Sequence, residues 1–136
     1  MSDCNIDEVL CWGPDSFTVL SNSAVAGCPH LTNFANLEKF TKIDSYAFSS
    51  DISFERDLIL PNLTTLGSGA FYKTLVKTAI IDNVQSIGSE TFYNCPNLTK
   101  VSCNSATAIN GTAFYQCSAL KEVYARNVVS IIGRAF

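Results

Sequence analysis

The sequence has little charge, no cluster of basic residues and no long hydrophobic segment. Only 15% of its 136 residues are charged, and the nine lysines and arginines are dispersed from Lys39 onward. The basic face that nucleic-acid binding requires is therefore missing. No stretch approaches the length needed to cross a membrane. We expect neither nucleic acid nor an inserted membrane segment among the contacts of this protein.

The N-terminus also lacks the apolar core of a secretory signal, because MSDCNIDEVLCW is acidic. This absence predicts a cytoplasmic protein. The alternative is a cell-surface protein that is processed, or exported without a standard signal. With 47% hydrophobic residues, the chain can form one domain with a continuous core, which excludes a disordered protein.

Catalytic and cofactor-binding motifs are missing as well. His30 is the single histidine, and the surrounding CPHLTN offers no nearby acid to complete a triad with Ser or Cys. There is no Walker loop, and the Gly-x-Gly of LGSGAF is a chance match inside a repeated block rather than a dinucleotide fingerprint. We predict no enzymatic activity, no catalytic residues and no cofactor.

The sequence does contain a block that recurs every 21–23 residues and ends in phenylalanine. The copies are KIDSYAF ending at Phe48, TLGSGAF at Phe71, SIGSETF at Phe92, AINGTAF at Phe114 and SIIGRAF at Phe136, with a weaker VLSNSAV ending at Val25. A fixed period of this length, carried by apolar positions, is typical of a solenoid.

Equivalent apolar positions should stack inside the coils of such a solenoid. One column lies five residues before each block end and holds Leu20, Ile43, Leu66, Ile87, Ile109 and Ile131. Another holds Leu58, Ala79, Val101 and Val123. The alternation in LTKVSCN predicts a short strand that stacks into a parallel sheet. SETFYNC has no strand pattern and predicts a short helical turn on the opposite side, with its phenylalanine in the core.

This pattern closely resembles the BspA-like, or Treponema-type, leucine-rich repeats, whose repeat is approximately C-x-x-L-x-x-V-x-[LI]-x-x-[LV]-x-x-I-G-x-x-A-F. The resemblance covers residues 19–136, about five repeats with the last truncated at Phe136, and leaves residues 1–18 as an N-terminal cap. It implies an α/β fold: a short, curved, right-handed solenoid with a parallel sheet on the concave side and short helical turns on the convex side. It also implies binding rather than catalysis, often in adhesion proteins on bacterial or protist surfaces.

The cysteines allow several interpretations. Cys28, Cys95 and Cys117 lie three residues after their block ends, so they fall in one column. They could form a disulfide or a metal site, or a ladder of small buried thiols, which the resemblance favours. Cys103 occupies a core column and is expected to be structural.

The cysteines near the N-terminus leave a similar choice. Cys4 and Cys11, with Cys28 and His30, lack the paired spacing of a zinc site, and a Cys4–Cys11 disulfide would require an oxidising compartment. The preferred interpretation is an amphipathic cap in which apolar residues cover the first coil, namely Val9, Leu10, Trp12 and Phe17. We predict six reduced cysteines and no metal site.

Outward positions on the predicted strands are candidates for a binding surface. They form three columns: Asp57, Thr78, Lys100 and Glu122; Ile59, Ile80, Ser102 and Tyr124; and Pro61, Asp82, Asn104 and Arg126. The middle column is largely apolar and is rimmed by charges of both signs, as in protein-binding patches. The alternative is that β-branched and aromatic residues merely suit a sheet. We predict that a protein partner binds the concave side, where the candidate contacts are Asp57, Ile59, Thr78, Ile80, Asp82, Lys100, Ser102, Asn104, Glu122, Tyr124 and Arg126.

Two other functions stay open. The protein could be a structural element that docks or stacks through its solenoid ends, or a fragment of a surface adhesion protein. The repeat stops at Phe136, so the core columns at that end lack a following coil. We therefore expect Ile131 and Phe136 to be covered by self-association, by a partner or by further chain.

Overall fold

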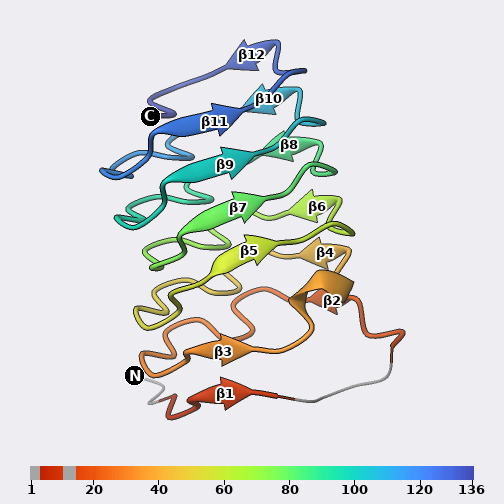
Figure 1. Cartoon of the computed structure of the whole chain (residues 1–136), viewed down its shortest axis with the longest axis vertical. Coiled ribbons are helices and arrows are strands. Elements are labelled where there is room, and N and C mark those ends of the chain that lie inside the picture. The colour runs from red at the N-terminus through yellow and green to blue at the C-terminus, as the bar shows by residue number, and fades with distance from the viewer. Residues whose placement is uncertain (1–3, 11–14) are drawn as a thin grey trace.

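The computed structural model describes residues 4–10 and 15–136 and shows a stack of coils, most of which contribute two short strands (Figure 1). Its elements are β1 (Glu8–Val9), β2 (Val19–Leu20), β3 (Asn33–Phe34), η1 (Leu37–Lys39), β4 (Lys42–Ile43), β5 (Asp57–Ile59), β6 (Thr65–Leu66), β7 (Thr78–Ile80), β8 (Ser86–Ile87), β9 (Lys100–Ser102), β10 (Ala108–Ile109), β11 (Glu122–Tyr124) and β12 (Ser130–Ile131).

All strand pairs are parallel and join equivalent strands of successive coils. The odd-numbered strands form the sheets β1-β3 and β5-β7-β9-β11, and the even-numbered strands form β2-β4-β6 and β8-β10-β12. Leu58 pairs in register with Ala79, which pairs with Val101. The predicted columns and period are therefore confirmed. The even-numbered strands, which carry the column from Leu20 to Ile131, are a second strand in each coil that the sequence pattern did not reveal.

The predicted helical turns are absent, and this part of the α/β fold class is wrong. In the described residues the only helix is the 3₁₀ segment η1. The block-end phenylalanines donate their amides to the next coil instead, from Phe48 to the carbonyl of Ala70 at 2.8 Å and from Phe92 to that of Ala113 at 2.8 Å. A residue with a left-handed backbone conformation lies two positions after each block end from Val25 to Phe114, such as Asn94 with φ of 52°. Left-handed residues interrupt a right-handed helix, so the fold is a parallel β-solenoid.

The block-end phenylalanines stack in a continuous column through the core. Neighbouring ring centroids from Phe48 through Phe136 are 5.2, 5.6, 5.6 and 5.5 Å apart, and the rings are nearly parallel. Phe48, Phe71 and Phe92 are fully buried, whereas Phe136 is 56% exposed. Stacked aromatic pairs contribute roughly 0.5–1.5 kcal/mol beyond their buried area, so this column stabilises the coils in register.

A second column lies three residues after each block end and connects the coils through polar atoms. Its members are Cys28, Asp51, Thr74, Cys95 and Cys117. The Cys28 amide donates to Oδ1 of Asp51 at 2.8 Å. The thiols of Cys95 and Cys117 donate to the carbonyls of the phenylalanines one coil earlier, at 3.1 and 2.9 Å. A small side chain with a polar atom here satisfies backbone groups that would otherwise be buried without partners.

The prediction of six reduced cysteines is wrong, because Cys4 and Cys28 form a disulfide. Cys4 lies 24 residues before Cys28, so the bond joins equivalent positions of successive coils. It also rules out the zinc site and the Cys4–Cys11 pairing; Cys11 itself lies outside the described residues. Cys95, Cys103 and Cys117 are free, which agrees with the prediction that these three cysteines are reduced.

Asp51 is the one residue in this column that has a carboxyl group, and it is fully buried. Its Oδ2 has no hydrogen-bond partner among the described residues. Burial raises the pKa of Asp51 to about 8, although amides of Cys28 and Gly27 bond to the carboxyl and act in the opposite direction. The side chain is therefore mainly protonated at neutral pH, beneath the backbone of the disulfide-bonded Cys28.

The phenylalanine column can be tested by truncation. Phe92→Ala should destabilise the fold by about 3–5 kcal/mol, because it leaves a cavity between two stacked rings in a core that cannot close around it. Phe136→Ala, at the exposed end of the same column, is the matched control and should cost much less. Chemical denaturation measures both values. A Phe92→Ala protein as stable as the wild type would contradict the stacking register.

The buried carboxyl predicts a particular pH dependence. The folded protein keeps the Asp51 proton up to about pH 8, whereas an unfolded carboxyl releases it near 3.8. The folded state therefore binds more protons in this window, and stability should fall as pH rises through it. Asp51→Asn should remove this fall and be more stable than the wild type above pH 8, while the exposed Asp57→Asn should retain the wild-type slope. Parallel stability curves for the wild type and Asp51→Asn would contradict the assignment.

Candidate interaction surface

The predicted site residues lie together on one face. We call the outward side of β5, β7, β9 and β11, with the residues two positions after each strand, the four-strand face. The strand register aligns Asp57 with Thr78, Lys100 and Glu122, and Ile59 with Ile80, Ser102 and Tyr124. Hydrogen bonds align the residues of the third column. The amide of Asn104 donates to Oδ1 of Asp82 at 3.0 Å, and the amide of Arg126 donates to Oδ1 of Asn104 at 3.4 Å. Binding by this face stays a prediction.

The middle column is apolar at its two ends rather than along its whole length. Ile59 is 62% exposed and Tyr124 is 44% exposed, whereas Ile80 is half-buried. Ser102 is buried and donates its hydroxyl to Asp82 at 2.7 Å. The face therefore presents two apolar side chains that a polar cluster separates.

That polar cluster is held in place by its own contacts. Oδ1 of Asp82 accepts hydrogen bonds from the Ser102 hydroxyl and from the Nδ2 of Asn104, at 2.7 and 3.0 Å. Partial burial alone would raise the pKa of Asp82, but these hydrogen bonds and the Asn104 amide outweigh it and lower the pKa. The carboxylate is therefore charged at neutral pH and fixed in orientation, which suits it to accept a further hydrogen bond from a partner.

Tyr124 is fixed by two neighbours on the same face. Its hydroxyl donates to Oε2 of Glu122 at 2.9 Å, and Nζ of Lys100 lies 5.1 Å from the ring centroid. The hydrogen bond to Glu122 raises the pKa of Tyr124. An aromatic ring that is already oriented loses little side-chain entropy when a partner covers it.

A groove that the sequence did not predict borders Ile59. The sheet order is interrupted between β3 and β5, where Asn36 has a left-handed φ of 59° and η1 follows. A cavity of about 300 Å³ opens there, lined by Leu37, Glu38, Arg56, Asp57, Leu58, Ile59, Leu60 and Pro61. The Arg56 guanidinium donates to the carbonyl of Phe34 at 2.8 Å, which bridges the interruption. The only sequence signal is the run NFANLEKF, which departs from the strand pattern of later repeats.

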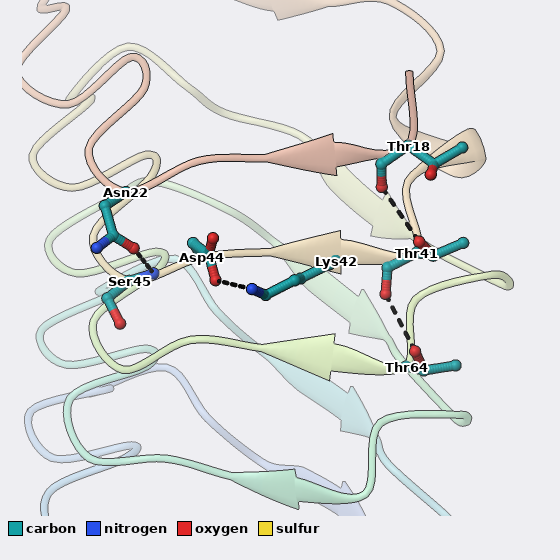
Figure 2. A network of polar contacts seen from close by, with 7 residues as sticks. All are labelled: Thr18, Asn22, Thr41, Lys42, Asp44, Ser45 and Thr64. Atoms are coloured by element: carbon teal, nitrogen blue, oxygen red, sulfur yellow. Dashed lines mark hydrogen bonds and ion pairs between the residues drawn. The ribbon is translucent and has the colours of Figure 1, made fainter. Parts of the chain in front are cut away.

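Polar side chains along the sheet β2-β4-β6 also bond to the protein itself (Figure 2). Thr41 donates its hydroxyl to the carbonyl of Thr18 at 3.3 Å, and Thr64 to that of Thr41 at 3.2 Å. Lys42 forms an ion pair of 2.9 Å with Asp44. The two threonine hydrogen bonds connect successive coils beside this sheet.

The residues predicted to form the N-terminal cap do not all behave alike. Val9 and Phe17 are partly buried against the core, whereas Leu10 is 59% exposed, so its predicted role in covering the first coil is wrong. Trp12 lies outside the described residues. β1 pairs in parallel with β3. The boundary between cap and repeats at residue 18 stays a prediction.

The C-terminal end has an exposed apolar surface. Ile131 is 57% exposed, although its column partner Ile109 is buried. Beside Phe136 lies an open cavity of about 400 Å³, lined by Phe114, Gln116, Cys117, Ser118, Leu120, Lys121, Val123 and Phe136. Phe114 is buried, because the Phe136 ring stacks on it.

Other kinds of site find little support in the described residues. His30 is exposed on a turn. No group of three or more His, Cys, Asp or Glu side chains within residues 4–10 and 15–136 could hold a metal ion. In the same part of the chain, no helix has the length and apolar character to cross a membrane.

Comparison with known proteins agrees with this architecture. The family model of the BspA type leucine rich repeat region matches residues 2–83 and 54–136, with six copies. A solved leucine-rich repeat protein from Bacteroides ovatus is 29% identical, with a TM-score of 0.62 over 90% of this chain. This chain spans 38% of that protein. Comparison with curated protein sequences found no significant match. Proteins of this family are in general not enzymes. Because the family model covers nearly the whole chain, this protein belongs to the BspA-type leucine-rich repeat family.

Proposed function

We propose that this protein is a non-enzymatic binding module that contacts a protein partner through the four-strand face. The observation that carries the proposal is the exposure of Ile59 and Tyr124, at 62% and 44%. Both occupy outward strand positions, where folding requires no apolar side chain. Exposed apolar and aromatic side chains that are surrounded by charge form the energetic centre of many protein interfaces.

The face has the features of a two-part interface. Ile59 lies beside the groove between β3 and β5, which offers a recess for a partner's side chain. Tyr124 at the other end is fixed by Glu122 and Lys100. Between them, the charged Asp82 can accept a hydrogen bond, which would give specificity. A partner with two apolar contacts and a donor between them fits this arrangement.

The place of binding that we propose is the cell surface or another oxidising compartment. The Cys4–Cys28 disulfide supports this location, because such bonds persist in oxidising environments and are rare in the cytoplasm. It favours the predicted alternative over the predicted cytoplasmic location, and it agrees with a role in adhesion.

Affinity capture with matched variants tests this proposal. Immobilised wild type, Ile59→Asp and Ile52→Asp are incubated separately with surface and cytoplasmic proteins of the source organism. Ile52 is 57% exposed outside the four-strand face, so its substitution controls for a new surface charge. We expect a surface protein that the wild type and Ile52→Asp retain and that Ile59→Asp binds at least about tenfold more weakly.

Two results of the capture experiment would contradict the proposal. A partner retained equally by Ile59→Asp and the wild type would place binding elsewhere on the molecule. A partner found only among cytoplasmic proteins would contradict the proposed location while leaving the binding face intact.

The second candidate function is assembly through the C-terminal end, and a specific observation supports it. Ile131 and the open cavity beside Phe136 occupy positions that a following coil would cover. Leu120 and Val123 are half-buried there, although their counterparts Leu98 and Val101 are fully buried. We propose that this end receives another coil of the same kind, which would complete the core columns.

Sedimentation of the 136-residue chain tests this assembly. The wild type should associate as its concentration rises, because the apolar end is removed from water on association. Ile131→Lys should stay monomeric, whereas Ile52→Lys should associate like the wild type. A wild type that is monomeric at its highest soluble concentration would show that the exposed end is tolerated, and would exclude self-association through it.

A further inference from the structure

We propose that Cys95 and Cys117 are a redox pair that forms an inter-coil disulfide on reaction with a low-molecular-weight disulfide such as oxidised glutathione. This proposal is independent of the binding function proposed above. It assigns a modification site to two thiols in the column three residues after each block end, and it follows from where the backbone places them.

The backbone brings these two cysteines together in successive coils. The amide of Asn94 donates to the carbonyl of Tyr115 at 2.8 Å, which connects the coils one residue before Cys95 and two residues before Cys117. Three residues before the cysteines, the rings of Phe92 and Phe114 stack at 5.6 Å. Hydrogen-bonded neighbouring strands lie about 4.7–4.9 Å apart, which is within the Cα separation that disulfides span.

The same column already contains a disulfide between successive coils. Cys4 and Cys28 are 24 residues apart in the sequence and their Cα atoms are 4.8 Å apart. Cys95 and Cys117 occupy the equivalent positions of two later coils. The backbone geometry of this column is therefore compatible with a disulfide, and the second pair needs oxidation rather than a rearrangement of the coils.

The two thiols differ in access, which assigns them different roles. Cys117 is half-buried and lines the open cavity at the C-terminal end, whereas Cys95 is fully buried. The neighbouring Cys95 thiol lowers the pKa of Cys117, while burial raises the pKa of Cys95. Because the thiolate is the nucleophile, Cys117 is the thiol that attacks first and Cys95 is the thiol that completes the bond.

The reaction consists of two thiol–disulfide exchanges. The Cys117 thiolate attacks one sulfur of the small disulfide, forming a mixed disulfide and releasing one small thiol. Cys95, on losing its proton, attacks the Cys117 sulfur and releases the second small thiol. Two protein thiols are oxidised to one disulfide, and the small disulfide is reduced to two thiols, so electrons and protons balance.

Cys103 is an internal control because it has no cysteine neighbour in its column. It is fully buried between the coils that place Ile81 and Ala125 at the equivalent positions. Burial, followed by the charge of Asp82, raises the pKa of Cys103 to about 11. The same oxidant should therefore leave Cys103 as a free thiol.

Oxidation would change the C-terminal end of the solenoid. The bond replaces the hydrogen bond from Cys117 to the carbonyl of Phe92 and connects the last coils covalently beside the open cavity. The disulfide restricts the conformational freedom of these residues in the unfolded chain, which should raise the melting temperature of the protein. A coil docked on the cavity would shield Cys117, so assembly at this end and oxidation should compete.

The experiment is a disulfide map of the folded chain after treatment with excess oxidised glutathione. Free thiols are then alkylated, and peptides are sequenced by mass spectrometry without reduction. We expect a Cys95–Cys117 bond in most molecules, alkylated Cys103 and an intact Cys4–Cys28 bond. Alkylated Cys95 and Cys117 beside an intact Cys4–Cys28 bond would overturn the proposal, as would a bond from either cysteine to Cys103.

Single variants test the order of attack. Cys95→Ser should stop at a stable mixed disulfide on Cys117, because no second thiol is present to displace glutathione. In the Cys117→Ser variant, Cys95 should react with oxidised glutathione at least about tenfold more slowly than Cys117 reacts in the Cys95→Ser variant. Equal rates would overturn the assigned order. The wild-type map itself does not depend on how well either variant folds.

Discussion

The backbone hydrogen bond from one coil to the next is the interaction on which this molecule depends. The strands pair between coils, and the turn segments also hydrogen-bond to a neighbouring coil, as Phe92 does to Ala113. No coil can satisfy its backbone alone. The equal spacing that these bonds impose stacks the phenylalanine rings and aligns the thiols of the neighbouring column. Core, polar column and disulfide positions therefore follow from one repeated contact.

This arrangement separates the residues that build the fold from those that are available for function. Side chains that point into a coil are constrained by their counterparts above and below, whereas outward positions such as Ile59 and Tyr124 are free of that requirement. The C-terminal coil of these 136 residues is the other exception, because within them it has a neighbouring coil on one side only. The exposed Ile131 follows directly from this. The two surfaces that we propose for binding and assembly are thus the two places where the repeat leaves side chains without an internal role.

Much of the architecture was predictable because the period is carried by apolar residues. The columns through Leu58 and Ile87 could be assigned from spacing alone, and the residues of the four-strand face followed from alternation. The turn was not predictable in the same way, because its left-handed positions are held by residues such as Lys73 and Asn94 rather than glycine. The Cys4–Cys28 bond has a signal in the sequence, since its separation of 24 is close to one repeat, although the local spacing of the cysteines does not indicate it. The burial of Ser102 and the groove beside Ile59 depend on side-chain contacts and on a local interruption of the sheet that spacing does not encode.

The most direct test of this account is whether the turn segments hydrogen-bond between coils. Scalar couplings across hydrogen bonds, measured by NMR on isotope-labelled protein, identify the carbonyl that each amide contacts. The account predicts a coupling from the Phe92 amide nitrogen to the carbonyl carbon of Ala113, and the equivalent coupling from Phe48 to Ala70. A coupling from Phe92 to the carbonyl of Gly88, four residues earlier, would indicate a helical turn and would contradict the central claim.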